Sequence, residues 1–411
     1  MSLSFRKTGA RFAIRIGAWT GAAGTLFCGQ IASAADVYYQ PVVSVATNAN
    51  SNIDLTSSQP TFAEGYLADA STLIGVATPR SEMTLLPRLT YQYYPTQKEL
   101  DRLEAFLAGT GSYSWQRDRF TTDVFFDHRD DLNSQQPSAD YNPVTPGIGN
   151  TNPGTGRIII GSTRNFLIVD PTFTHQLTPR SNMGVAAEYQ RMSYSQSDTS
   201  GHIDFNYYLG RVFYGWNLTP RMDASISAFG SQYVAGSIDS HSTSGGAILK
   251  TSYNWSPALH SSLSLQYQET SLKETSPRTL SDSSHPWGAE VSTVYVGTTS
   301  TYRADVGRTI GPSAAGGLFE SDQIRGQYDR DFTRRLHFTG ALRFFHDKTI
   351  SGISGSARSY TNALLRLQYM LSARMFVAGS YSNRWEKYTG SPGADGNVVS
   401  LQFGYRGLPR Q

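Results

Sequence analysis

Apolar and polar residues alternate over long stretches of this chain. From 399 to 405 every second residue is valine, leucine or aromatic, and the residues between them are serine, glutamine and glycine. A period of two places the two kinds of side chain on opposite faces of a β-strand. The pattern therefore predicts long strands with one apolar face and one wet face. The same alternation recurs in the segments 183–189, 263–267 and 363–371.

A short turn motif recurs along the chain. An apolar residue is followed by Thr or Ser, then Pro or a substitute, then usually Arg. Pro suits the second position of a tight turn, and the hydroxyl of Thr or Ser bonds the local backbone. Successive Thr or Ser positions are 41, 37, 77 and 39 residues apart, the 77 being a double step. Each unit therefore predicts two strands, a short turn and a longer loop. The copies stand at 77–80, 177–180, 218–221, 255–258, 332–335 and 371–374.

Strand length and facing decide between architectures with this period. A propeller blade has a similar repeat, and a β-sandwich has shorter strands every 8–12 residues. Strands of about ten residues with one apolar face are typical of transmembrane barrels, which also carry aromatic residues near strand ends. We predict an all-β, antiparallel, up-and-down transmembrane β-barrel. The expected girdle residues are Tyr93, Tyr94, Trp115, Trp216, Trp255, Trp287 and Trp385.

The pattern predicts 18 strands, with 16 as the alternative. An even number puts both termini in the periplasm, so the short turns are periplasmic. The longest interruption, 129–161, is expected to be an extracellular loop or one folded into the pore. The predicted strands are 37–47, 68–77, 81–94, 104–116, 119–128, 163–176, 181–194, 203–216, 221–234, 243–255, 259–272, 286–297, 300–310, 319–332, 335–348, 359–371, 374–387 and 396–407.

The first 34 residues have the composition of a secretory signal. Four basic residues precede a mostly apolar stretch at 16–31, and Ala32-Ser33-Ala34 forms an A-x-A cleavage site. We expect a signal peptide at 1–34, one barrel domain at 35–411 and a location in the cell outer membrane. Removal of the signal takes away four of the 35 lysines and arginines and none of the 32 acidic residues, leaving a formal charge of −1.

This composition excludes several kinds of chemistry. The single cysteine, Cys28, lies in the signal, so the mature chain has no disulfide or thiolate site. A near-neutral mature chain gives no indication of nucleic-acid binding. No metal or cofactor motif is present, and the eight histidines are scattered. We predict no enzymatic activity, no metal and no cofactor; an outer-membrane hydrolase is a distant alternative. The nearest cluster with acid–base character is His128 with Asp127, Asp130 and Asp131.

Three features carry a resemblance to a known family. The segment 41–45 is followed by an Asn-rich stretch at 48–53, then come hairpins with Arg-rich turns, and a closing strand at 398–406. In these features the chain resembles the bacterial outer-membrane β-barrel porins of type 2. The resemblance implies export of exopolysaccharide, with a periplasmic export partner. The closing strand resembles the signal read by the barrel-assembly machinery, with Phe403 and Tyr405 on the lipid face.

The inward faces are predicted to carry two charged walls. Arginine keeps its charge and suits carboxylate or phosphate partners. Alternatively, Asp305, Asp329 and Asp331 pair with the arginines and neutralise them. The expected basic wall is Arg303, Arg325, Arg343, Arg366, Arg384 and Arg406, and the expected acidic wall is Asp123, Glu188, Asp204 and Asp223.

The predicted function is a non-enzymatic outer-membrane pore. On the family resemblance it is a conduit for secreted polysaccharide; the alternative is a general or anion-preferring porin for small solutes. At about 18 strands the lumen is wide enough for an aqueous channel unless loops plug it. The expected partners are outer-membrane lipid, the barrel-assembly machinery and, for export, the polysaccharide itself.

Overall fold

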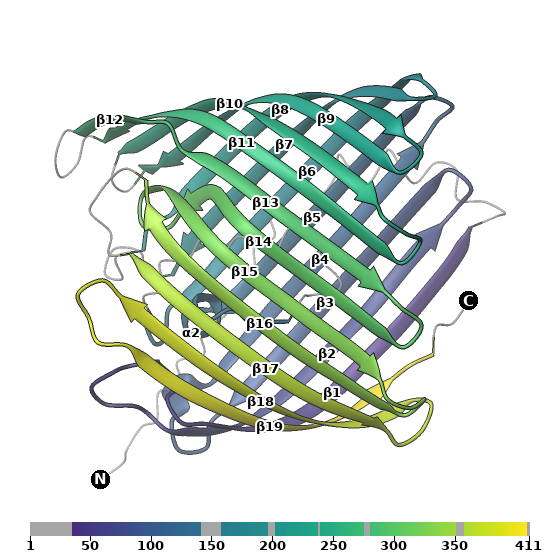
Figure 1. The fold of residues 1–411 in the computed structure, drawn as a ribbon. Coiled ribbons are helices and arrows are strands. Elements are labelled where there is room, and N and C mark those ends of the chain that lie inside the picture. Colours follow the sequence, from purple (N-terminus) through teal and green to yellow (C-terminus); the bar gives the residue numbers. More distant parts are fainter. Residues whose placement is uncertain are drawn as a thin grey trace, which may run out of the picture.

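A single antiparallel sheet closes on itself in the computed structural model (Figure 1). The structure describes residues 35–140, 158–195, 202–236, 239–274, 280–350 and 357–408. The predicted signal at 1–34 lies outside these residues, so it stays a prediction. The first strands are β1 (Asp36–Asn50), β2 (Ala63–Ala77), β3 (Ser81–Tyr93), β4 (Arg102–Ser114), β5 (Asp118–Asp130), β6 (Thr163–Thr178), β7 (Ser181–Tyr194), β8 (Phe205–Thr219), β9 (Met222–Ala235) and β10 (Ser240–Asn254). The others are β11 (Leu259–Glu274), β12 (Leu280–Ser284), β13 (Trp287–Val296), β14 (Ser300–Ser313), β15 (Gly317–Asp331), β16 (Leu336–Thr349), β17 (Arg358–Met370), β18 (Met375–Tyr388) and β19 (Ala394–Arg406).

Each strand pairs with its neighbours in the sequence, and β1 pairs with β19 to close the barrel. The closing register runs from Val42 opposite Arg406 to Asn50 opposite Val398. Strands β12 and β13 both pair with β11, one after the other, so they fill one position in the wall. The 19 strands therefore make an 18-strand barrel, which confirms the predicted fold class and count.

The period of two separates the faces of the wall as predicted. Val399 and Leu401 of β19 are 57% and 59% exposed on the outer face, whereas Gln402, the residue after Leu401, bonds Ser44 of β1 on the inner face. An apolar outer surface with a polar lumen is the arrangement of a barrel that crosses a bilayer. In the described part of the chain, no helix is long and apolar enough to span a membrane.

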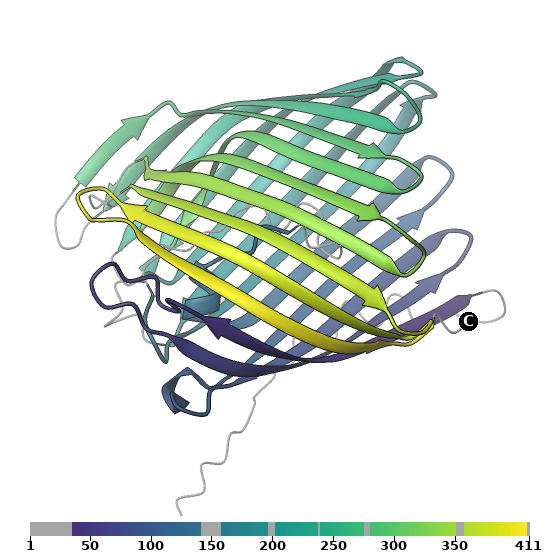
Figure 2. The ribbon, with the colours of Figure 1, turned by 60° about the horizontal axis from the view of Figure 1, so that its bottom comes forward.

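The connections differ at the two ends of the barrel. Turns of two to four residues join the strands at one end, which we call the turn end (right in Figure 1), and every connection of five or more residues lies at the other, the loop end (Figures 1 and 2). The turn motif works as its residues suggest. In the turn between β8 and β9, the Thr219 hydroxyl oxygen accepts a bond from the backbone N–H of Arg221, at 3.2 Å.

Three details of the sequence prediction need correction. Strand β2 begins at Ala63, five residues before the predicted start. The stretch between the predicted strands 259–272 and 286–297 contains a further strand, β12. Tyr94 does not belong to the lipid-facing girdle: it follows the end of β3, is 3% exposed and packs inside the loop end with Leu100.

Candidate functional site

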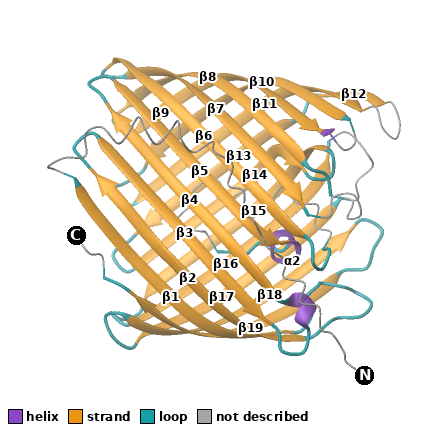
Figure 3. Ribbon diagram, turned by 180° about the vertical axis from the view of Figure 1, so that it is seen from behind, coloured by secondary structure: helices purple, strands orange, loops and turns teal. Residues whose placement is uncertain are grey.

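A short helix enters the lumen directly after β5. Helix α2 (Asp131–Gln135) begins where the Asp130 carboxylate accepts a bond from the backbone N–H of Leu132, at 2.9 Å. Arg102 of β4 donates to the same carboxylate at 3.0 Å. This side-chain cap turns the chain inward instead of prolonging the hairpin. The chain then continues to 140 inside the barrel, and Figure 3 shows α2 within its outline. We call residues 131–140 the inner segment.

The carboxylate of Asp131 holds the start of the inner segment. It accepts hydrogen bonds from His202 Nε2, the backbone N–H of Ile159 and Gln135 Nε2, each at 2.9 Å. Asp131 is fully buried and His202 is 1% exposed. The His202 ring also stacks on Tyr194 at the end of β7, with ring centres 4.3 Å apart. The carboxylate therefore ties three separate stretches of chain together at the loop end.

Side chains of the barrel wall hold the rest of the inner segment. Arg358 of β17 donates to the Gln135 carbonyl and to the Glu386 carboxylate, both at 2.5 Å. Tyr360 donates through its hydroxyl to the Pro137 carbonyl, at 3.2 Å. The guanidinium group of a wall arginine thus binds the backbone of the inner segment. Its N–H donors can bond carbonyl oxygens as well as carboxylates. Arg325 likewise donates to the backbone carbonyls of Ala139 and Asp140, whereas Arg384 donates to the side-chain oxygen Oε1 of Gln136.

The six arginines of the predicted basic wall lie on six consecutive strands, β14 to β19. The six arginines differ in exposure according to their position between the loop end and the turn end. Arg325, Arg343 and Arg384 are 5–8% exposed and lie in the loop-end half or middle of the wall. The other three lie nearer the turn end and are half-buried or exposed: Arg303, Arg366 and Arg406.

Two of the three aspartates expected as neutralising partners, Asp329 and Asp331, have other contacts. Asp329 accepts from the Thr339 hydroxyl at 2.7 Å and from Gln327 Nε2 at 2.5 Å. Asp331 bonds His337 at 2.7 Å. Arg366 donates to Gln402 Oε1 at 2.8 Å. Asp305, in contrast, is 7% exposed and lies directly opposite Arg325 in the register of β14 and β15. Internal pairing of the basic wall therefore stays an alternative at this position.

Three carboxylates lie on neighbouring strands on the opposite side of the barrel. Asp123 of β5 is directly opposite Asp170 of β6 in the register, and Glu188 lies on β7. Asp170 was not in the predicted acidic set. Asp204 lies outside this wall, because β8 begins after it and its carboxylate accepts from the backbone N–H of Tyr194. Asp223 lies at the turn end of β9, beside Ser252.

A cavity of about 650 Å³ opens along the inner wall between β7 and β13, in the turn-end half of the lumen. Its charged lining residues are Lys250, Glu290 and Asp223, and His260 also contributes. Serine and asparagine side chains provide much of the remaining surface, among them Asn182. A concave site of this volume is the size that small-molecule sites typically have.

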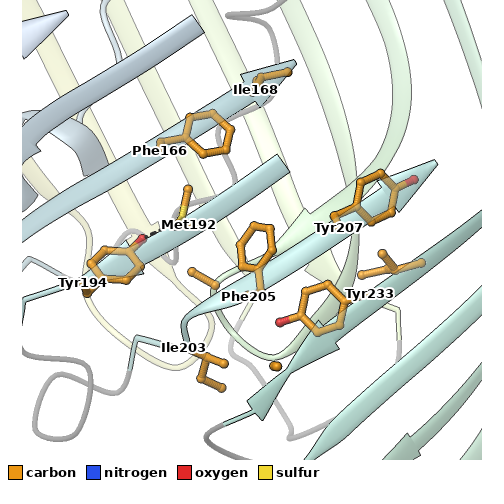
Figure 4. Packing of buried hydrophobic residues seen from close by; sticks show 11 residues of the cluster. Phe166, Ile168, Met192, Tyr194, Ile203, Phe205, Tyr207 and Tyr233 are labelled. Carbon is orange, nitrogen blue, oxygen red and sulfur yellow. Dashed lines mark hydrogen bonds between the residues drawn. The ribbon is translucent and has the colours of Figure 1, made fainter. Parts of the chain in front are cut away.

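An apolar cluster lies inside the barrel at the loop end (Figure 4). Phe166, Met192 and Tyr233 of the inner wall pack together and are 1–3% exposed. The adjoining ends of β14 and β15 and the connection between them join the cluster: Tyr233 donates through its hydroxyl to the Ser313 carbonyl at 3.0 Å, and Ala314 and Leu318 belong to the cluster. Apolar side chains on the inner face therefore fasten a second connection over the lumen.

The cluster around His128 does not form a site with acid–base geometry. The Asp127 carboxylate binds Arg164 at 2.8 Å, whereas His128 bonds Asn165. Asp130 and Asp131 serve the inner segment. Within the described ranges, no group of three or more His, Cys, Asp or Glu residues is arranged to hold a metal ion.

The fold and the occupied lumen define a class of protein: a closed transmembrane β-barrel of 18 strands narrowed by an inner segment. Neither a family model nor a curated protein matches the chain, so the likeness to the type 2 porins stays a resemblance.

Among solved structures, the chain is similar to OccAB3 of Acinetobacter baumannii, at 9% identity and a TM-score of 0.44, with 91% of this chain and 100% of that chain covered. It is similar to OccK5 (OpdH) of Pseudomonas aeruginosa, at 12% identity and a TM-score of 0.45, with 92% and 99% covered. It is also similar to OpdK of Pseudomonas aeruginosa with vanillate, at 10% identity and a TM-score of 0.43, with 91% and 99% covered.

Proposed function

We propose that the chain forms a water-filled outer-membrane pore for small solutes, after removal of residues 1–34, and that it catalyses no reaction. The inner segment carries this proposal. It is held across the lumen by Arg358, Tyr360 and Arg384, which lie on β17 and β18. A backbone segment fixed at several points narrows the lumen but leaves an aqueous path beside it.

This narrowing supports the small-solute alternative over the polysaccharide conduit. A polymer needs a continuous wide path, whereas the inner segment and the connection between β14 and β15 both reach into the loop-end half of the lumen. The cavity of about 650 Å³ beyond them accommodates a small molecule.

The two charged walls supply the selectivity of the proposed pore. Arg303 and Arg366 reach the lumen on one side, and Asp123 and Glu188 lie on the opposite side. Charged walls in a low-dielectric channel concentrate ions of opposite charge and set up a field across the lumen. A solute that enters experiences that field, and the basic wall favours anions.

Ion selectivity in planar bilayers tests the proposal. The variant Arg303→Gln with Arg366→Gln removes two positive charges from the wall while leaving the arginines that hold the inner segment. We expect its reversal potential in a salt gradient to shift towards cations, more at low salt because screening is weaker there. The matched variant Asp123→Asn with Glu188→Gln should shift the reversal potential the opposite way.

Three outcomes would count against the proposal. A purified barrel without ion conductance would reject the pore. Unchanged selectivity in both variants would show that these walls do not face the conducting path. Passage of large dextrans in liposome-swelling assays, at rates close to those of monosaccharides, would restore the polysaccharide conduit as the better explanation.

A further inference from the structure

The turn motif has a role that the pore does not explain. In five of the turns, an arginine occupies the position two residues after the Thr or Ser, and its backbone N–H donates to that hydroxyl oxygen at 3.1–3.3 Å. The hydroxyl bond fixes the backbone of the turn. It does not require arginine: Ala258 makes the same bond to Ser256, at 3.2 Å. The five arginines are Arg80, Arg180, Arg221, Arg335 and Arg374.

An exposed apolar side chain precedes most of these arginines on the outer face. Leu177, Leu218 and Leu371 are 41–49% exposed, and Phe332 is 53% exposed. Each stands three residues before an arginine. In a barrel that crosses a bilayer, such side chains lie against lipid at the membrane boundary. The following arginine therefore lies at the depth where the acyl chains give way to phosphate groups.

Charge is distributed unevenly between the two ends of the barrel. The eight turns contain seven exposed arginines, the five above with Arg117 and Arg334, and no acidic residue. The described loop-end connections contain seven acidic residues and one lysine, Lys98. The mature chain as a whole has a formal charge near zero. The positive charge of the turn end is therefore concentrated locally, and it complements an anionic surface.

We propose that the turn end is a binding ring for anionic phospholipids of the membrane leaflet that surrounds it. Each leucine or phenylalanine contacts acyl chains, and the arginine that follows binds the headgroup phosphate through its planar donors. A basic residue at an anionic membrane surface increases association about fivefold. The ring orients the barrel in the bilayer and enriches anionic lipid around it.

The ring is incomplete on one side. The turns between β10 and β11 and between β13 and β14 contain no arginine. Trp255 and Val296 lie there, 58% and 56% exposed, so the apolar anchors are kept without the charge. Anionic lipid should gather at the other six turns and leave this sector to neutral lipid. The sector also offers a built-in control, because Ala258 occupies the position that arginine has elsewhere.

Native mass spectrometry of the mature barrel tests this proposal. The barrel is released from equal parts of phosphatidylglycerol and phosphatidylcholine, and the lipids that stay bound are counted. We expect several phosphatidylglycerol molecules per barrel, and at least fivefold fewer when all seven turn arginines are changed to glutamine. Ala258→Arg should add bound phosphatidylglycerol. A control changes four outward cations near the loop end to glutamine and should leave the count unchanged: Arg191, Arg308, Lys348 and Lys387.

If the variant with seven changed arginines does not fold, the wild type and the Ala258→Arg variant still test the proposal. Equal retention of both lipids by the wild type, in low salt as in high salt, would overturn the proposal. So would an Ala258→Arg variant that binds no additional phosphatidylglycerol. Retention of isolated peptidoglycan by the wild type, lost in the sevenfold variant while lipid retention is unchanged, would assign the ring to a cell-wall polymer instead.

Discussion

The Asp131 carboxylate offers the sharpest test of how the lumen is narrowed. Asp131→Ala removes the acceptor for His202, Ile159 and Gln135, three bonds of 2.9 Å at a fully buried position. A hydrogen bond to a charged group contributes roughly 1.5–3 kcal/mol. Only the bonds from His202 and Ile159 join the inner segment to other parts of the chain, and taken at the low end they sum to about 3 kcal/mol. Because 1.4 kcal/mol is a factor of ten, the ratio of held to released inner segment should fall by about 10².

The expected result is a wider and less steady channel. Single-channel recordings of Asp131→Ala should show a larger mean conductance and transitions between conductance levels, because the segment leaves the lumen for part of the time. The wall itself should stay folded, since none of the three bonds joins neighbouring strands. Heat-modified mobility on gels, measured alongside, should therefore match the wild type.

Asp140→Ala is the matched control. It also removes one negative charge from the inner segment, but the Asp140 carboxylate accepts a bond from Ser138 of the same segment, and Arg325 binds the Asp140 backbone carbonyl. We expect wild-type conductance for this variant. If Asp131→Ala and Asp140→Ala behaved alike, the carboxylate would not be what holds the segment, and the wall arginines alone would have to do so.

Two further predictions concern topology and assembly. In whole cells, a reagent excluded from the periplasm should label Ser391→Cys, at the loop end, and spare Thr298→Cys, in an exposed turn; the opposite labelling would invert the barrel. Phe403 and Tyr405 are 42% and 40% exposed on the outer face of β19. Changing both to arginine costs up to about 4 kcal/mol each, depending on depth, so barrel levels in the outer membrane should fall, whereas Ser400→Arg on the inner face of the same strand should assemble normally.

The wall of the barrel was predictable because it obeys one local rule. A strand with one face in lipid repeats every two residues, and the hydroxyl-containing turns mark where strands reverse. The rule fails where the inner face is apolar. Phe166 and Tyr233 point into the lumen although their residue types suggest lipid. They are buried because a connection from across the barrel covers them, and no local pattern contains that contact.

The inner segment was only half predictable for the same reason. The stretch 129–161 is rich in Pro, Gly, Asn and Asp, which indicates an irregular connection but not its direction. The contacts that decide its direction join residues 186 and 248 positions apart, Arg325 with Ala139 and Arg384 with Gln136. Composition cannot reveal such pairs. The closure of the barrel brings them together only after the strands are in register.

One feature of the sequence distinguishes the inward arginines that contact the inner segment from those that do not. Distance along a strand from the turn motif measures depth in the wall, at about 3.3 Å per residue. Arg366 stands five residues before Leu371, and its guanidinium reaches the lumen. Arg325 stands seven residues before Phe332, and Arg384 ten residues after Arg374; both are covered by the inner segment. The inner segment descends from the loop end, so it meets the arginines farthest from the turns first. The two inward arginines farthest from their turns, Arg325 and Arg384, therefore contact the inner segment, whereas Arg366, nearer its turn, bonds Gln402 of the wall.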